Sequence, residues 1–185
     1  MDERDQDKKV RLFTALRVPA EFTAAVKKLS RKGLEAHWLP PDDLHITLRF
    51  LGDLPLERVP EIRQVLDRVR RPRFSVDTGG LGRFDLKKQS VLWAAVQSTR
   101  KLTALAGDIN EVLAPLGFEM PVKPYVPHVT LARLKSSKGL DSYIKQHEKA
   151  LSFHWQACSF GLYYSAPPDE KGNRYRSLSE FPLQP

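Results

Sequence analysis

Short stretches in which apolar residues alternate with polar ones, or run uninterrupted, are separated along this chain by stretches with helical spacing. The first kind predicts β-strands, at residues 10–18, 44–51, 74–76, 90–96, 128–134, 153–164 and 175–183. Apolar residues three or four positions apart predict helices, at about residues 20–31, 59–69, 102–116 and 140–151. Glycine-containing stretches at residues 52–53 and 79–82 are expected to turn the chain. This mixture predicts an α+β fold, and its partly repeated order indicates a coarse internal duplication.

One tetrapeptide occurs twice within this pattern, on two of the predicted strands. His45-Ile46-Thr47-Leu48 returns as His128-Val129-Thr130-Leu131. Because alternate side chains of a strand share a face, the His and Thr of each copy point one way and the aliphatic residues point to the core. If helices cover one face of each sheet, the two His/Thr pairs line a cleft between two lobes. Two facing imidazoles can act as an acid and a base near neutral pH.

The composition is that of an ordinary globular protein with one added feature, an excess of positive charge. The chain has 185 residues, of which 41% are hydrophobic and 28% charged, enough to bury one sizeable core. We expect residues 1–9 to be a flexible segment and residues 10–185 to form a single bilobal domain. The net charge of +8 favours anionic partners, nucleic acid first, although such a charge also serves solubility alone.

The sequence offers no sign of membrane insertion or of disulfide bonding. No apolar stretch approaches the roughly 20 residues that cross a membrane, and the charged N-terminus lacks an apolar leader segment. We therefore expect a cytoplasmic protein without membrane association, and nothing demands more than a monomer. The single cysteine, Cys158, cannot form an intrachain disulfide. It lies among apolar residues, so we expect it in the core.

A metal site is the main alternative use for two histidines. Zinc usually takes three or four protein ligands. Asp42, Asp43 and Asp53 lie near the first copy, but no carboxylate is repeated beside His128, and the sequence has no HExxH motif or Cys-His cluster. We therefore expect no metal at the site. The remaining histidines have no repeated context and are expected at the surface or on helices: His37, His147 and His154.

Two arginines follow the motifs and are candidates for phosphate contacts. Strand parity puts Arg49 on the face of His45, two residues past Thr47. Parity puts Arg133 on the face opposite to His128, unless a β-bulge intervenes. A surface position is the alternative for both.

Together these stretches resemble the two-histidine phosphoesterase superfamily, and most closely its RNA 2',3'-cyclic phosphodiesterase branch, also called the 2'-5' RNA ligase family. Residues 11–19 resemble the family's opening strand, residues 44–53 its first HxTx block and residues 127–133 its second. The resemblance runs from about residue 11 to residue 183. It departs at Gly82-Arg83-Phe84-Asp85, where the family often has a Gly-x-Phe-Pro turn.

The resemblance implies a bilobal α+β fold with pseudo-two-fold symmetry, each lobe an antiparallel sheet flanked by helices. It implies hydrolysis of a terminal 2',3'-cyclic phosphate on RNA to a 2'-phosphomonoester without metal or cofactor, and for some members 2'-5' ligation. It also implies that His45 is the proton donor and His128 the proton acceptor, an order that two near-identical motifs cannot supply. Thr47 and Thr130 can offer hydroxyl donors to phosphate oxygens, and Arg133 is a phosphate contact by similarity.

Two other functions stay open at this point. The chain is either an enzyme of this kind or a module that binds RNA ends or nucleotides without turnover. The same chemistry can also act on 2'-5' oligonucleotides or small cyclic nucleotides, because all of these are anionic. Both histidines and both threonines are intact, and a module that only binds is free to lose them.

Overall fold

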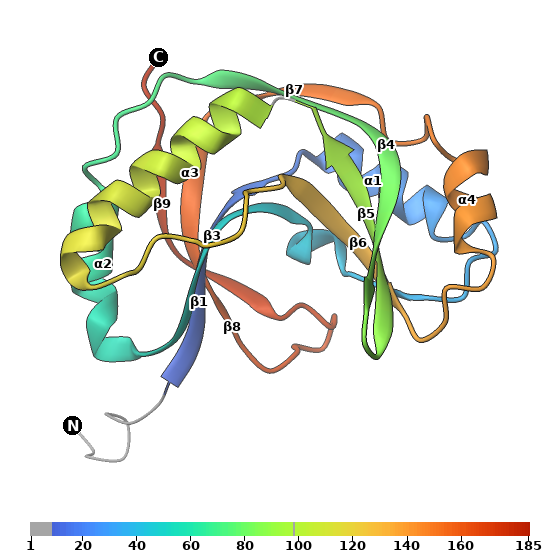
Figure 1. Cartoon of the computed structure of the whole chain (residues 1–185), viewed down its shortest axis with the longest axis horizontal. Helices are drawn as coiled ribbons and strands as arrows, with labels where there is room; N and C mark the ends of the chain where they lie inside the picture. Colours follow the sequence, from blue (N-terminus) through green and yellow to red (C-terminus); the bar gives the residue numbers. More distant parts are fainter. Residues whose placement is uncertain (1–8, 98) are drawn as a thin grey trace.

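A single antiparallel sheet forms the framework of the computed structural model, which describes residues 9–97 and 99–185 (Figure 1). Its strands are β1 (Lys9–Arg17), β2 (His37–Trp38), β3 (His45–Pro55), β4 (Phe74–Leu86), β5 (Gln89–Val96), β6 (His128–Leu134), β7 (Phe153–Ala157), β8 (Ser159–Ser165) and β9 (Tyr175–Pro182). The helices are α1 (Ala20–Leu29), α2 (Val59–Leu66), α3 (Thr99–Leu113) and α4 (Leu140–Gln146). The predicted α+β class is confirmed, and all four predicted helices are present. The predicted flexible segment lies outside the described residues except for Lys9, which begins β1.

The strand order shows two equivalent halves joined at one point. The order is β7-β4-β5-β6-β3-β1-β8-β9, with β2 paired to β6. In one half β1 lies between β3 and β8, and in the other β5 lies between β6 and β4. The halves meet where β3 pairs with β6, through Ile46 and Val129. The two predicted lobes are therefore halves of one sheet, joined at the aliphatic residue in the middle of each motif.

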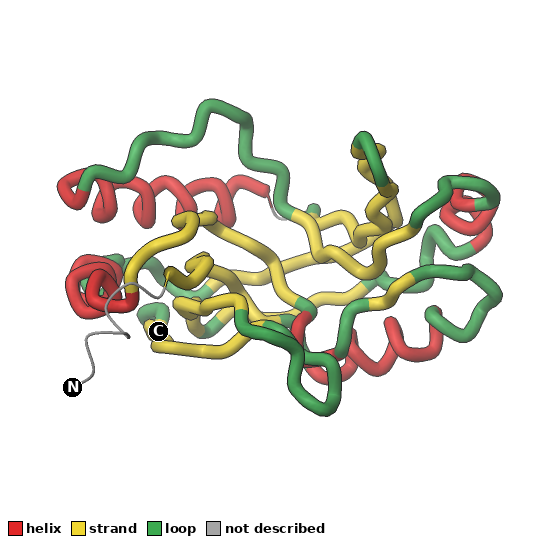
Figure 2. Tube along the Cα trace, turned by 90° about the horizontal axis from the view of Figure 1, so that it is seen from below, coloured by secondary structure: helices red, strands yellow, loops and turns green. Residues whose placement is uncertain are grey.

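Helices tie the halves together because two of them cross from one half to the other. Helix α1 follows β1, yet its Phe22 packs against Phe153 and Trp155 of β7. Helix α3 follows β5 but packs on β3 and α2. Figure 2 shows α1 and α3 on opposite faces of the strand layer. Each of these two helices thus packs its apolar stripe on one half of the sheet, although the strand that precedes the helix belongs to the other half.

Both predicted glycine turns are wrong. Strand β3 continues through Gly52, which pairs with Leu12 of β1. Strand β4 continues through the stretch 79–82, where Gly82 serves close packing and Gly80 a shift of register rather than a reversal. A Cβ on Gly82 would lie 2.3 Å from the ring of Trp93 on β5. Gly80 has a φ of +87° where the register of β4 shifts against β5. The stretch 82–85, where the resemblance departs, is likewise paired strand.

Cys158, expected in the core, is exposed. It is the single residue between β7 and β8, where the chain passes from one half of the sheet to the other. Its apolar neighbours in sequence belong to the strands on either side, so they do not enclose it. Separately, no helix in the described part of the chain is long and apolar enough to cross a membrane.

Candidate active site

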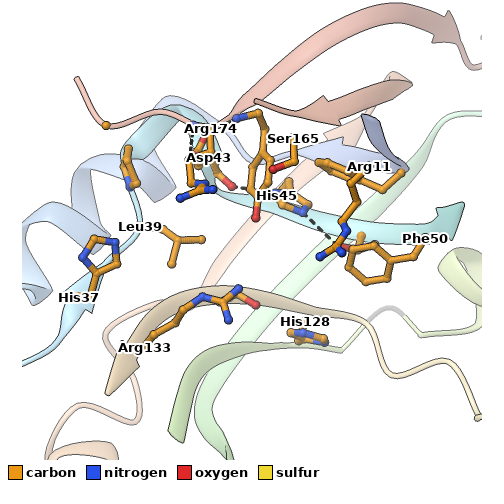
Figure 3. Close-up of a pocket in the computed structure, with 16 residues that line it drawn as sticks. Arg11, His37, Leu39, Asp43, His45, Phe50, His128, Arg133, Ser165 and Arg174 are labelled. Carbon is orange, nitrogen blue, oxygen red and sulfur yellow. Dashed lines mark hydrogen bonds between the residues drawn. The ribbon is translucent and has the colours of Figure 1, made fainter. Parts of the chain in front are cut away.

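The junction between β3 and β6 places the two motifs against each other. Around the pair formed by Ile46 and Val129, antiparallel register sets His45 toward Thr130 and Thr47 toward His128. All four polar side chains line one cavity of about 560 Å³. Figure 3 shows the two histidines on facing sides of this cavity. The repeated tetrapeptide therefore builds one site from two halves.

The two imidazoles are held in the same way. Nδ1 of His45 lies 2.7 Å from the carbonyl oxygen of Asp43, and Nδ1 of His128 lies 2.8 Å from that of Val126. A carbonyl only accepts, so each Nδ1 carries a proton and each Nε2 is the nitrogen that can exchange a proton with a bound molecule. Nε2 of His45 lies 3.0 Å from the hydroxyl of Thr47, which donates to it when the ring is neutral.

Aromatic rings fix the orientation of both histidines. His45 lies between Phe13, at 5.0 Å between ring centroids, and the edge-on ring of Tyr175, at 5.1 Å. His128 meets Phe84 edge-on at 5.1 Å and Trp93 at 6.1 Å. Each imidazole thus has little freedom to rotate away from the cavity, as acid–base chemistry requires.

Burial changes the protonation of His45. Loss of solvation, together with the proximity of His128, lowers the pKa of His45 to about 4, although the hydrogen bond to the Asp43 carbonyl opposes the change. His45 is therefore neutral at pH 7 when the cavity holds no anion.

Asp43 anchors this half of the site, and sequence analysis considered it only as a metal ligand. Its carboxylate is 2% exposed and accepts hydrogen bonds from the backbone N–H groups of Arg174, at 2.8 Å, and Tyr175, at 3.1 Å. It therefore holds the start of β9 beside His45, while its backbone carbonyl orients the imidazole. No pattern in the sequence distinguishes it from the neighbouring Asp42, because its partners lie far along the chain.

Asp53, another carboxylate near the first motif, is also engaged elsewhere. Asp53 forms an ion pair with Arg11 at 3.1 Å. Among the described residues there is no group of three or more His, Cys, Asp or Glu side chains placed to hold a metal ion. The donor set around the two histidines does not fit a zinc site.

Strand irregularities decide where the two candidate arginines lie. On β6, Thr130 pairs with Trp93 but Ala132 pairs with Leu92, so Leu131 is an extra residue. Arg133 then falls opposite Val91, on the face of His128, and lines the cavity. Strand alternation alone places Arg133 on the opposite face, and the β-bulge at Leu131 brings it into the site.

The same irregularity on β3 removes Arg49 from the cavity. Here Leu48 is the extra residue, and Arg49 pairs with the fully buried Thr14. The Arg49 guanidinium donates to the carbonyl of Glu119 and does not line the cavity. The placement of Arg49 by parity is therefore wrong. Phe50 takes the position equivalent to Arg133, opposite Phe13, and lines the cavity with 64% of its surface exposed.

Comparison with known proteins assigns the family. A model of the 2'-5' RNA ligase superfamily matches residues 17–167, which include both motifs. The chain belongs to the 2'-5' RNA ligase superfamily. The geometry above is thus that of a superfamily member with both histidines and both threonines in place.

Individual superfamily members agree over most of the chain. The RNA 2',3'-cyclic phosphodiesterase of Thermotoga maritima is 33% identical over 133 residues, which cover 68% of this chain and 71% of that protein. The protein of the same name from Methanocaldococcus jannaschii is 28% identical over 164 residues, covering 84% and 91%. The crystal structure of Escherichia coli LigT complexed with 3'-AMP aligns with a TM-score of 0.80 at 25% identity, covering 96% of this chain and 99% of that one.

Proposed function

We propose that this superfamily member is an RNA 2',3'-cyclic phosphodiesterase, which opens a terminal 2',3'-cyclic phosphate to a 2'-phosphomonoester. The observation that carries the proposal is the pair of His/Thr sets facing one cavity from equivalent strands. Relatives with this name, at about 30% identity, support the same activity. Ligation through a 2'-5' linkage uses the same groups, with a 5'-hydroxyl in the place of water.

In the proposed reaction, His128 takes a proton from water as the water oxygen bonds to phosphorus. The bond between phosphorus and the 3'-oxygen breaks, and His45 gives that oxygen a proton. Thr47 and Thr130 donate hydrogen bonds to the non-bridging phosphoryl oxygens, and Arg133 pairs with their charge. Preorganised donors of this kind contribute on the order of several kcal/mol to a transition state. The reaction needs no metal or cofactor.

The donor role of His45 requires a proton on Nε2, which the substrate-free protein lacks at pH 7. An anionic cyclic phosphate favours the charged imidazolium and raises the pKa of His45 from about 4. The Thr47 hydroxyl, released from Nε2, then turns to a phosphoryl oxygen. Removing a general acid abolishes the alkaline limb of a bell-shaped pH–rate profile, and removing a general base abolishes the acidic limb. Residual activity of His45→Ala should therefore lack the alkaline limb, and loss of the acidic limb instead would reverse the two roles.

The direct test uses an RNA oligonucleotide ending in a 2',3'-cyclic phosphate, with EDTA present. We expect a 2'-phosphate product, and a loss of about 10²–10⁴-fold in kcat for His45→Ala and for His128→Ala. Thr47→Val and Thr130→Val should lose less, and His147→Ala, directly after α4, is the matched control. Full turnover in either motif histidine variant, or loss of activity with EDTA and recovery with zinc, would contradict the mechanism. Tight RNA binding without turnover would indicate a binding module.

We also propose that residues 10–185 act as one domain, as a monomer, in the cytoplasm. Support for the monomer comes from the site itself, because one chain supplies both histidines and both threonines. Light scattering at micromolar concentration tests the monomer, and cell fractionation tests the location.

A further inference from the structure

A second cavity opens directly beside the active site. It has a volume of about 880 Å³ and is lined by residues 32–37, which lead into β2, and by residues 133–136, 138 and 139, which lead from β6 into α4. His37 and Arg133 line both cavities, so the two are continuous. Figure 3 shows His37 and Arg133 together at one end of the active-site cleft, with Arg11 and Phe50 at the other end.

This basic groove carries uncompensated positive charge. Its charged side chains are all exposed, and four are cationic against one carboxylate: Lys32, Arg133, Lys135, Lys138 and Glu35. Within the described parts of the chain, none of the four cations forms an ion pair. Arg11, at the opposite end of the cleft, is by contrast neutralised by Asp53.

The two walls of the groove are tied together by a buried contact. The hydroxyl of Tyr143 on α4 donates to the carbonyl of Leu29, at the end of α1, at 2.7 Å. Tyr143 is 6% exposed and forms part of the groove. This bond fixes the segment with Lys32 opposite the loop with Lys135 and Lys138. The groove is therefore preformed, which reduces the entropy lost on binding.

We propose that the basic groove binds the phosphate backbone of RNA immediately upstream of the cyclic phosphate. The inference rests on the proposed function, and it makes an oligonucleotide end the preferred substrate over a nucleoside cyclic phosphate. When the 2',3'-cyclic phosphate of the terminal nucleotide lies between the histidines, the rest of the RNA continues from the 5'-phosphate of that nucleotide. The RNA chain must therefore leave the cleft at one end or the other. Phe50 suits a nucleobase at one end, whereas unpaired cations suit phosphates at the other.

Continuity along the chain supports this direction. Arg133 lies on the motif strand itself, and Lys135 and Lys138 follow within the loop that begins where β6 ends. An RNA chain that leaves the active site, where Arg133 pairs with the cyclic phosphate, therefore meets the two lysines next. Contacts of this type hold the backbone without reading sequence, so the groove should accept any RNA sequence.

The test compares two substrates that share the same 3'-terminal nucleotide: a nucleoside 2',3'-cyclic monophosphate and an oligonucleotide ending in the same group. Three proteins are assayed for kcat/KM: wild type, Lys135→Ala/Lys138→Ala, and the control Arg100→Ala/Lys101→Ala on α3. Since all four substituted side chains are exposed, the variants should fold normally. The lysine variant should lose about tenfold on the oligonucleotide and keep its rate on the mononucleotide. For the oligonucleotide, the slope of log kcat/KM against log salt concentration should become shallower by about 1.4. Each phosphate contact with a single strand contributes about 0.7 to this slope, and the variant loses two contacts.

Each alternative result has a distinct meaning. Equal losses on both substrates, or an unchanged salt dependence, would overturn the groove proposal while hydrolysis of the mononucleotide leaves the proposed function intact. An equal loss in the Arg100→Ala/Lys101→Ala control would show a general effect of net charge and also overturn it. Failure of the wild type to hydrolyse either substrate would overturn the function and the groove proposal together.

Discussion

Protonation of His45 links the geometry of the site to a measurable free energy. Burial holds the pKa of His45 at about 4 in the folded protein, against 6.5 for an unperturbed side chain. Between these pH values the unfolded chain carries a proton on residue 45 that the folded protein does not. The unfolded state thus binds more protons there, so the contribution of this residue to stability falls as pH drops from about 7 toward 4.

The size of the effect follows from the same two values. A fall in pKa from 6.5 to about 4 corresponds to about 3 kcal/mol of unfolding free energy, lost almost fully at the lower pH. His45→Gln removes the titration and keeps an amide donor near the Asp43 carbonyl. The stability of wild type relative to this variant should therefore fall by up to about 3 kcal/mol between pH 7 and pH 4.

Urea unfolding followed by circular dichroism, at half-unit steps of pH, measures this difference. His154→Gln, an exposed histidine on β7, is the control for losing a histidine outside the cavity. NMR titration of the imidazole gives the pKa directly, and saturating inorganic phosphate should raise it. A stability difference between wild type and His45→Gln that stays constant across this range would refute the argument from burial.

Four further substitutions test the surroundings of the site. Asp43→Asn removes a charged acceptor of two backbone N–H groups and should cost about 3 kcal/mol in urea unfolding; an unchanged midpoint would contradict its anchoring role. Arg133→Ala should raise KM by about tenfold, since a charged hydrogen bond contributes about 1.5 kcal/mol or more. Arg49→Ala should leave KM unchanged. Steady-state kinetics on the oligonucleotide measure both, and a raised KM for Arg49→Ala with an unchanged KM for Arg133→Ala would contradict the placement of the two arginines. Gly82→Ala should lower the free energy of unfolding by about 1–3 kcal/mol, because its Cβ would meet the Trp93 ring. A melting temperature equal to that of the wild type would contradict this packing.

Much of the framework could be predicted because it depends on local patterns. Apolar spacing located the helices, and alternation located the strands that carry both motifs. The glycine stretches misled, because the reason for a glycine at position 82 is a ring on the neighbouring strand. Cys158 misled in the same way, since apolar neighbours in sequence did not become neighbours in space.

By itself the sequence determined which side chains can do the chemistry. Strand alternation put the His and Thr of each motif on one face, and repetition of the motif indicated that two such faces form one site. Those inferences hold because they depend only on neighbouring residues of the chain and on the alternation of side chains between the two faces of a strand.

Only the tertiary structure decided what surrounds those groups. An extra residue in each motif strand placed Arg133 and Phe50 in the cavity and Arg49 outside it. The anchoring by Asp43 and the lowered pKa of His45 also depend on β1, β9 and the facing motif. The physical reason is that strand register, burial and the field at a buried ring are set by partners distant in sequence.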